Sequence, residues 1–386
     1  MQMYKPYKPK RDWTQWVGLI ARMLFGLTFI FSGFVKAIDP LGFAYKQQDY
    51  LEVWNLTTLG NLTLLAAILI SALEFMLGVS ILLGIRLRET AWGGFIFMII
   101  MTPLTLWIAL KNPVVDCGCF GDALVISNWG TFWKNVVLLA LIITVILTNR
   151  NRYNEYLSPL PSWLLAISFG FIPIAFSCYS LHYLPIIDFR PYKIGANIQE
   201  GMLIPEGTES DQYETTFIYE KDGVEKEFTL ENYPWQDTTW HFVDQTSVLV
   251  KKGFTPAIHD FSITTSSGDD ITDIILNDED TIYLIVMYDL SKTNTKNLAA
   301  INQLYKEQTA LGAKFYALTA SYQGDIETFK EAHDAPYQFC TADPITLKTM
   351  IRANPGIMVL KQGTIIDKYN SNSVHKYLIN NFQNNK

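Results

Sequence analysis

Two of the four cysteines in this 386-residue chain lie one glycine apart, in the segment VVDCGCFGDAL. Chain geometry keeps the Cα atoms of Cys117 and Cys119 within about 7 Å, and Gly118 permits the bend that would bring the sulfurs together. A disulfide between them would close a very small ring, and strained disulfides are the more readily reduced ones. The pattern therefore predicts a catalytic or switching thiol pair rather than a structural bridge.

The residues around the pair determine how readily it would react. A thiol reacts as the thiolate, which needs exposure and a positive neighbour. Asp116 and Asp122 flank the pair, and neighbouring carboxylates oppose ionisation of a thiol. We therefore expect a compensating cation from elsewhere in the fold, with Lys36 and Lys111 as the candidates. Gly121 adds further conformational freedom to the segment.

Apolar segments flank the pair and make up most of the first half of the chain. A helix needs roughly 20 mostly apolar residues to cross a bilayer. We interpret the first segment as a retained span rather than a signal peptide, because it is long, contains Arg22 and ends in Lys36. An α-helical membrane bundle is therefore predicted from five candidate spans, at 13–37, 62–85, 91–110, 132–147 and 163–184.

Basic residues predict which end of the bundle faces the cytoplasm, because loops rich in Lys and Arg stay on that side. A cytoplasmic N-terminus puts the loop with Cys117 and Cys119 outside, together with everything after Leu184. In a bacterium this describes a multi-pass inner-membrane protein whose thiol pair and C-terminal half face the oxidising periplasm. The basic residues on the cytoplasmic side are Lys5, Lys8, Lys10, Arg11, Arg86, Arg88, Arg150 and Arg152.

The rest of the chain has the composition of a soluble protein. Residues 191–252 predict a periplasmic connector with a β-hairpin, because two β-rich runs surround Asp222-Gly223. From residue 253 onward strands and helices alternate, which predicts a mixed sheet that ends in an antiparallel pair around Gln362-Gly363. The predicted division is a membrane domain at 1–150, a fifth span at 151–190, the connector at 191–252 and an α/β domain at 253–386.

The C-terminal order of elements resembles the thioredoxin-like fold, in the version used by peroxiredoxins and periplasmic thioredoxins. The segment ANPGIMVLKQGTIIDKY is similar to the cis-proline segment of that family, with Pro355 as the proline. In a working thioredoxin a Cys-x-x-Cys motif begins the helix after the central strand, where the helix N-terminus lowers the pKa of the attacking thiol. Here the stretch reads Lys292-Thr293-Asn294-Thr295, so this domain cannot carry out dithiol exchange by the usual route.

The first 150 residues resemble the MauE branch of the DoxX-like membrane proteins. The string DCGCFGDAL between two spans carries the likeness, together with ALEFMLGVSILLGIRLR and the opening helix. The resemblance implies a four-helix core and a redox-associated role in disulfide formation or in maturation of exported proteins. A fused thioredoxin-like domain is similar to an arrangement found in Bacteroidota. In the opening helix, RMLFGLTFIFSGFVKAIDPLGFAYK, the matching positions are Arg22, Ser32, Gly33, Lys36 and Asp39.

Two ionisable residues and two further cysteines lie away from the loop. Arg22 and Glu74 are about 13 and 16 Å from the cytoplasmic ends of the first two spans, where an unpaired charge is costly. An Arg22–Glu74 ion pair that fixes helix packing is the simpler interpretation, and a proton or quinone site between the helices is the alternative. Cys178 and Cys340 are interpreted as buried packing residues, with thiol sites near the loop or near Pro355 as the alternatives.

Three functions fit these residues. In the first, the Cys117–Cys119 pair exchanges disulfides with a periplasmic protein partner or a membrane electron carrier, as a thiol-disulfide oxidoreductase, while the degenerate thioredoxin-like domain docks the partner. In the second, the two thiolates bind Cu(I), although the sequence offers no His or Met cluster to complete a metal site. In the third, the chain is a non-catalytic membrane-anchored scaffold whose loop cysteines hold a turn.

Composition limits the partners further. The formal net charge of -7, with no basic cluster beyond the topology signals, argues against nucleic acid. The lipid bilayer is one partner of the chain, and the periplasmic protein is the other. The sequence identifies no cofactor-binding residues and leaves open whether a quinone binds.

Overall fold

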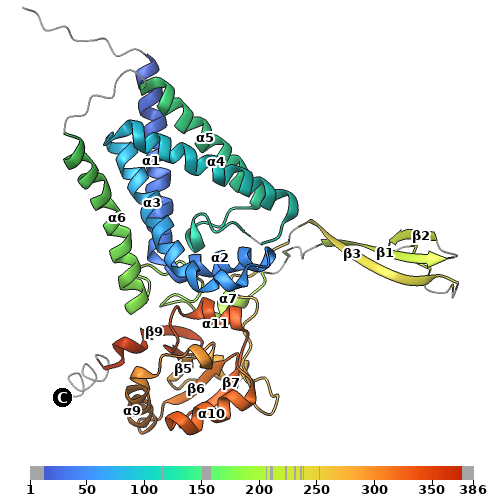
Figure 1. Cartoon of the computed structure of the whole chain (residues 1–386). Helices are drawn as coiled ribbons and strands as arrows, with labels where there is room; N and C mark the ends of the chain where they lie inside the picture. Colours follow the sequence, from blue (N-terminus) through green and yellow to red (C-terminus); the bar gives the residue numbers. More distant parts are fainter. Residues whose placement is uncertain are drawn as a thin grey trace, which may run out of the picture.

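The computed structural model contains the five long apolar helices that the sequence predicts, all within the described residues (Figure 1). These residues are 13–114, 116–149, 158–205, 207–208, 212–221, 224–229, 232–234, 237, 239–251 and 253–375. Six of the basic residues behind the orientation prediction lie outside them, namely Lys5, Lys8, Lys10, Arg11, Arg150 and Arg152. The spanning helices are α1 (Trp13–Ile38), α3 (Thr63–Leu83), α4 (Leu87–Lys111), α5 (Asn128–Asn149) and α6 (Pro159–His182).

α1 crosses α3 with almost no space between the two backbones. A Cβ added at Gly33 would lie 2.6 Å from the Phe75 amide nitrogen, and one added at Gly78 would lie 2.7 Å from the Ile30 nitrogen. Small residues at such crossings allow the close packing that holds membrane helices together. α1 also contacts α5 and α6, while large apolar side chains cover the outward faces of the helices.

A helix that the sequence analysis missed, α2 (Pro40–Val53), lies across one end of the bundle (Figure 1). Asp39 caps it by accepting a hydrogen bond from the Gly42 amide at 2.9 Å, and Pro40 occupies its first turn. Both are ordinary helix-start signals. The helix is polar and buries only Pro40 and Ala44, so it lacks the apolar periodicity by which a helix is usually predicted. The short η1 (Thr57–Leu62) then leads into α3.

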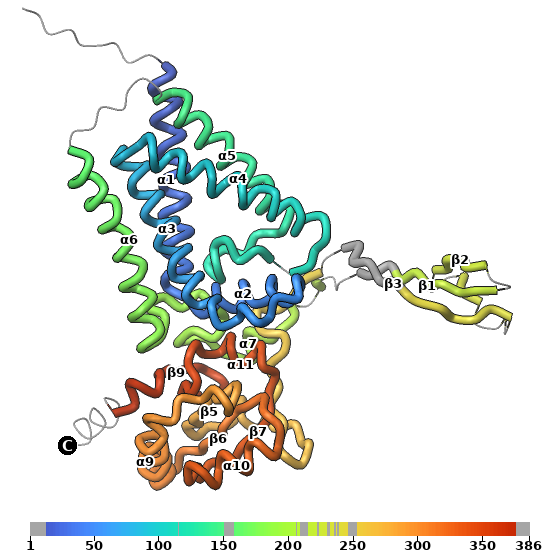
Figure 2. Tube along the Cα trace, viewed as in Figure 1, coloured from blue at the N-terminus to red at the C-terminus, as the bar shows by residue number. Residues whose placement is uncertain are grey.

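The loop between α4 and α5 carries the thiol pair. It contains η2 (Gly121–Ala123), which contacts α1. In Figures 1 and 2 this loop lies at the end of the bundle that also holds α2 and the C-terminal domain. Arg86 and Arg88, the two described residues of the basic set, flank the start of α4 at the other end of that helix. The pair and the described basic residues are therefore at opposite ends of the bundle.

The connector forms a three-stranded antiparallel sheet that projects from the rest of the molecule (Figure 1). Its strands are β1 (Gln212–Lys221), β2 (Val224–Thr229) and β3 (His241–Lys251), in the order β2-β1-β3. β1 and β2 pair from Lys221 and Val224 outward, which confirms the predicted hairpin, although its turn residues Asp222 and Gly223 lie outside the described residues.

The C-terminal domain is a six-stranded sheet with helices on it, and its topology is thioredoxin-like. β5, β6 and β7 are parallel, β8 pairs antiparallel with β5, and β9 pairs antiparallel with β8. The Asn354–Pro355 bond before β8 is cis, which confirms the predicted cis-proline segment. In the sheet order β4-β7-β6-β5-β8-β9 the strands are β4 (Thr264–Thr265), β7 (Gln338–Thr341), β6 (Lys314–Thr319), β5 (Ile282–Val286), β8 (Gly356–Lys361) and β9 (Thr364–Asn370).

Short helices and two residues of the connector complete the core of this domain. Tyr192 and Ile198, which precede the three-stranded sheet in the chain, pack into the core on one face of the six-stranded sheet. Cys340 lies in the same core and is 1% exposed, which confirms its interpretation as a packing residue. The helical elements are α7 (Ile198–Met202), α8 (Thr272–Leu276), η3 (Leu290–Lys292), η4 (Thr295–Asn297), α9 (Leu298–Thr309), α10 (Gln323–His333), α11 (Pro344–Met350) and η5 (Ser371–Ser373).

The prediction for Cys178 was wrong, because this residue is exposed on α6. Its neighbour Ser177 is fully buried and donates a hydrogen bond to the Ala37 carbonyl oxygen at 3.1 Å. Successive residues of a helix point about 100° apart, so the next side chain turns toward the outer face of the bundle.

Candidate functional site

The two thiols of the loop lie side by side, as their spacing predicts. The Sγ atoms of Cys117 and Cys119 are 2.8 Å apart and both cysteines are free. A disulfide bond is roughly 2.04 Å long, so less than about 1 Å of movement separates the dithiol from the bonded form. Gly118 has a φ of 67° and Gly121 a φ of 52°, a backbone region that glycine adopts at little cost.

Asp116 holds the turn rather than repelling the thiols. Its Oδ1 accepts a hydrogen bond from the Gly118 amide at 2.8 Å, and its Oδ2 lies 2.8 Å from the Lys46 ammonium. The Tyr50 hydroxyl donates to the Cys117 carbonyl oxygen at 3.2 Å. The charge of Asp116 is thus matched by a cation on α2, which offsets the opposition to thiol ionisation expected from the sequence.

A buried ion pair lies next to the loop inside the bundle. The Lys36 ammonium of α1 is 2.7 Å from the Glu74 carboxylate of α3, and both side chains are 4% exposed. The Ser32 hydroxyl is 2.7 Å from Glu74 Oε2 and 2.9 Å from the Cys119 carbonyl oxygen. This Lys36–Ser32–Glu74 group therefore connects the membrane interior directly to the backbone of the thiol pair.

The predicted Arg22–Glu74 ion pair was wrong. The Arg22 guanidinium instead donates to the carbonyl oxygens of Ile81 and Leu82, each at 3.1 Å, at the end of α3. The prediction counted depth from helix ends and treated those ends as level. α1 has 26 residues and α3 has 21, and the first turns of α1 extend past the end of α3. Glu74 consequently lies opposite Ser32 and within reach of Lys36.

The two thiols differ in acidity. The pKa of Cys119 is lowered to about 6, first because its sulfur accepts a hydrogen bond from Cys117, and then because Lys134 and Lys36 favour the thiolate against the cost of burial. The same hydrogen bond, with burial, raises the pKa of Cys117. Cys119 is therefore the thiolate of the pair near neutral pH.

Of the two cations that the sequence predicts beside the thiols, only Lys36 acts on them. Lys36 acts on the pair as expected, but the second cation is Lys134 of α5, whose ammonium lies 4.4 Å from the centre of the Phe120 ring. Lys111 is exposed at the end of α4. A lysine in the first turns of an otherwise apolar span, as in NWGTFWKNVVLL, was the available signal for Lys134.

Polar contacts fill the position where a thioredoxin carries its two cysteines. The Thr293 hydroxyl is 2.9 Å from the Asp289 carbonyl oxygen and 3.0 Å from Asn354 Oδ1, beside the cis Pro355. The Lys292 side chain is 75% exposed and its ammonium lies 2.8 Å from Asp289 Oδ2. Thr295, the last residue of the degenerate stretch, is exposed at the start of η4.

Arg352, three residues before Pro355, joins the C-terminal domain to the membrane bundle. Its Nε is 2.8 Å from Asp39 Oδ2, and its Nη2 is 3.2 Å from Asp122 Oδ2 in the thiol loop. Burial raises the pKa of Asp39, but Arg352 and the Gly42 amide outweigh that effect and hold the pKa below its ordinary value. The sequence analysis named both aspartates but missed their shared arginine, because no local pattern connects residues so far apart.

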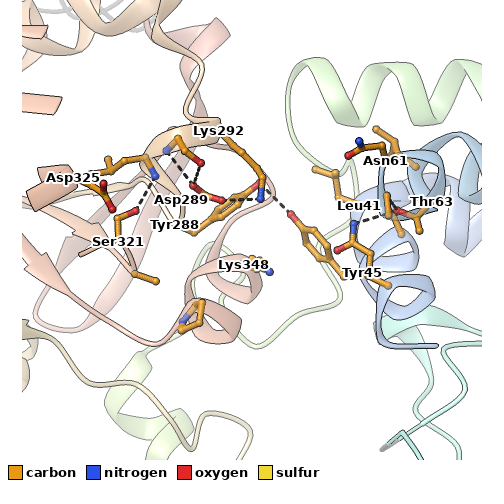
Figure 3. A pocket seen from close by; sticks show the side chains of 18 of the residues that line it. Leu41, Tyr45, Asn61, Thr63, Tyr288, Asp289, Lys292, Ser321, Asp325 and Lys348 are labelled. Atoms are coloured by element: carbon orange, nitrogen blue, oxygen red, sulfur yellow. Dashed lines mark hydrogen bonds and ion pairs between the residues drawn. The ribbon is translucent and has the colours of Figure 1, made fainter. Parts of the chain in front are cut away.

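Three hollows surround the loop and α2. A large interdomain cleft of about 990 Å³ separates α2 from the degenerate thioredoxin site, and the Tyr45 and Tyr288 hydroxyls meet across it at 3.3 Å (Figure 3). A polar cavity of about 330 Å³ lies between the loop and α11 and is lined by Gly118, Asp122 and Arg352. An apolar cavity of about 390 Å³ lies on the other side of the loop, inside the bundle, and both cysteines line it.

No group of three or more His, Cys, Asp or Glu side chains suited to a metal ion occurs in the part of the chain that the structure describes. Two thiolates can hold Cu(I), and Cys117 and Cys119 are the two that the described residues bring together.

Comparison with known proteins gives separate matches for different parts of the chain. No curated protein matches the chain. A solution structure described as "a putative protein disulfide isomerase from Bacteroides thetaiotaomicron" aligns with 32% of this chain and 84% of its own, at 13% identity and a TM-score of 0.26. Residues 213–252 match a domain of unknown function, DUF8463. Residues 14–148, from α1 to α5, match the family described as "Methylamine utilisation protein MauE", which confirms the family resemblance of the membrane part.

Proposed function

We propose that this protein is a membrane thiol-disulfide redox protein whose Cys117–Cys119 pair takes electrons from a thiol protein outside the cytoplasm. The observation that carries the proposal is the 2.8 Å contact between a stabilised thiolate and a neighbouring thiol. A dithiol whose reduced form is stabilised in this way is a strong oxidant once its disulfide has formed. The small strained ring of a Cys-Gly-Cys disulfide acts in the same direction.

The exchange proceeds through a mixed disulfide. A thiolate of the partner attacks Cys117 Sγ, and the Cys117–Cys119 bond breaks with Cys119 leaving as the thiolate, because the thiol with the lower pKa leaves faster. The second thiol of the partner then attacks the partner sulfur bonded to Cys117 and releases Cys117, which takes up a proton. The partner ends as a disulfide and the loop as a dithiol, so two electrons have moved.

The degenerate thioredoxin-like domain docks the partner and holds the loop. Its site lacks cysteines, but the site faces the interdomain cleft, which is lined by the exposed Lys292 and by the half-buried Tyr45 and Tyr288 (Figure 3). Arg352 of the same domain also holds the loop through its ion pair with Asp122. Access of a protein to the sulfurs requires the loop to turn outward, since Cys117 is 6% exposed, and the two glycines with positive φ permit this motion.

The pair functions on the periplasmic side of a bacterial inner membrane. The support is the predicted orientation, in which the described basic residues Arg86 and Arg88 lie at the end of the bundle opposite the pair. In intact cells a membrane-impermeant maleimide should label an exposed position on the pair's side, such as Tyr322→Cys, which is 85% exposed in wild type. Labelling of that position only after cell lysis would overturn the orientation.

The exchange is tested by trapping in intact cells. Cys119→Ser leaves Cys117 without the thiol with which it forms a disulfide. Cys117 can then join the partner only by attacking the partner's own disulfide, the reverse of the proposed transfer, and the loop has no second thiol to complete that reaction. A mixed disulfide with a second protein should therefore accumulate on Cys117 and disappear with reductant. Cys117→Ser and the exposed-residue control Cys178→Ser should trap nothing. If neither single-cysteine loop variant traps a protein, and the wild-type pair keeps one oxidation state under both reductant and oxidant, the scaffold function is correct instead.

A further inference from the structure

The apolar cavity beside the thiol pair is the feature that the exchange with a protein partner leaves unexplained. It lies among α2, α3 and α4, and its walls are mostly apolar, with Trp54, Leu59, Ile70 and Leu104 among them. A volume of about 390 Å³ is within the range of small-molecule sites, roughly 300–1,000 Å³. A cavity of this kind takes an apolar molecule with a few polar atoms.

Polar groups line part of this cavity. Cys117 and Cys119 line it together with Lys36 and Glu74, whose ammonium and carboxylate are 2.7 Å apart. Gln47 of α2 also lines the cavity, and its side-chain nitrogen is buried without a hydrogen-bond acceptor among the described residues. An unsatisfied buried amide donor costs free energy, and a ligand with a carbonyl oxygen would satisfy it.

Apolar side chains connect the cavity to the surface of the molecule. Trp54, Leu59 and Leu62 line the cavity and are also 44%, 43% and 56% exposed. This apolar rim suits the entry of a lipid-soluble ligand. The aqueous polar cavity, in contrast, is lined by Gly118 of the loop and by neither cysteine.

We propose that the apolar cavity binds a lipid-soluble quinone, which reoxidises the Cys117–Cys119 pair. A quinone combines an apolar ring with carbonyl oxygens that can accept a hydrogen bond from Gln47, and it takes up two electrons. This inference rests on the proposed function, since it supplies the oxidant that a pair receiving electrons from a protein partner needs for a second turnover.

The reaction balances without a further oxidant. Cys119 as the thiolate and Cys117 as the thiol form an S–S bond and lose two electrons and the one remaining thiol proton. The quinone gains the two electrons, the proton of Cys117 and one proton from water, which replaces the proton that Cys119 released on ionising. The products are the loop disulfide and a quinol, which returns to the bilayer.

The cavity is tested with the full-length protein in lipid nanodiscs, reduced, freed of reductant and kept without oxygen. Decylubiquinone and a short-chain menaquinone are the probes, and loop thiols are counted by mass spectrometry while quinol formation is followed by absorbance. Wild type should lose two thiols for each quinol formed. Ile70→Trp, which fills the cavity, should slow this oxidation by about tenfold or more, and Gln47→Leu should slow it measurably.

Two controls separate this inference from the proposed function. Leu73→Trp adds the same bulk on α3 at a position that is 41% exposed and does not line the cavity, so it should oxidise like wild type. The water-soluble oxidant diamide should oxidise the pair in every variant. If diamide works but neither quinone does, the quinone site is refuted and the proposed function stands.

Two further results are also decisive. If no oxidant changes the state of the pair, the proposed function fails as well. If Ile70→Trp leaves oxidation by quinone unchanged and the purified protein releases a phospholipid from this position, the cavity is a lipid site and the inference is overturned.

Discussion

The ion pair between Lys36 and Glu74 should dominate the stability of the membrane bundle near the loop. Both side chains are 4% exposed and their charged atoms are 2.7 Å apart. At an effective dielectric constant of about 20, two unit charges at that distance attract by about 6 kcal/mol. Removing one partner leaves the other charge buried and unpaired, which costs about 3–5 kcal/mol in proteins.

The prediction is tested by a double-mutant cycle with Lys36→Met, Glu74→Gln and the double variant. We expect each single variant to lose about 3–5 kcal/mol of unfolding free energy and the double variant to lose only about 2 kcal/mol, because no charge remains unpaired. Unfolding by SDS in mixed micelles can be followed through the fluorescence of the 10 tryptophans. The coupling free energy should therefore reach several kcal/mol.

An exposed pair provides the matched control. The ammonium of Lys292 and the carboxylate of Asp289 are 2.8 Å apart, but the Lys292 side chain is 75% exposed, so solvent screening should reduce the coupling in Lys292→Met and Asp289→Asn to below about 1 kcal/mol. If the costs of Lys36→Met and Glu74→Gln simply add in the double variant, the two residues are not each other's partner and the arrangement of the site described here is wrong.

Three further predictions concern the loop. The rate at which N-ethylmaleimide alkylates Cys119 should stay nearly constant down to about pH 7 and fall to about half near pH 6, because the thiolate is lost as the pH drops through its pKa of about 6. In SDS-denatured protein the rate should fall to half near about pH 9. The same midpoint in the folded protein would refute the lowered pKa. Gly118→Ala should cost about 1–2 kcal/mol of unfolding free energy, because its φ is 67°, whereas Gly60→Ala, with open space around it, should cost little; equal costs would contradict the strain. Arg352→Ala should increase hydrogen exchange of the loop around Asp122, and Arg352→Lys should do so less; unchanged exchange would show that this arginine does not hold the loop.

Most of the fold can be predicted from the length of the apolar segments and from the segment around Pro355. The five spans are readable because each is a long apolar run, and Pro355 is readable because it lies in a recognisable segment before a buried strand. α2 could not be predicted in this way because it is polar and only Pro40 and Ala44 are fully buried in it. Its start signals, Asp39 and Pro40, are present in the sequence but are too common to predict a helix without supporting periodicity.

The candidate site was predictable only where neighbours in sequence are neighbours in space. The approach of Cys117 and Cys119 follows from their spacing. The partner of Glu74 does not, because it depends on how far α1 slides past α3, and a few residues of offset exchange Arg22 for Lys36. The contact of Arg352 with Asp122 spans 230 positions of the chain, and only the assembled fold brings the two together.

The loop separates two cavities. Gly118 lines the polar cavity beside α11, whereas Cys117 and Cys119 line the apolar cavity inside the bundle. A protein donor would reach the sulfurs after the loop has turned outward, and a lipid-soluble acceptor would reach them while they line the apolar cavity. Donor and acceptor would therefore occupy different pockets, and each would meet the pair in a different position of the loop.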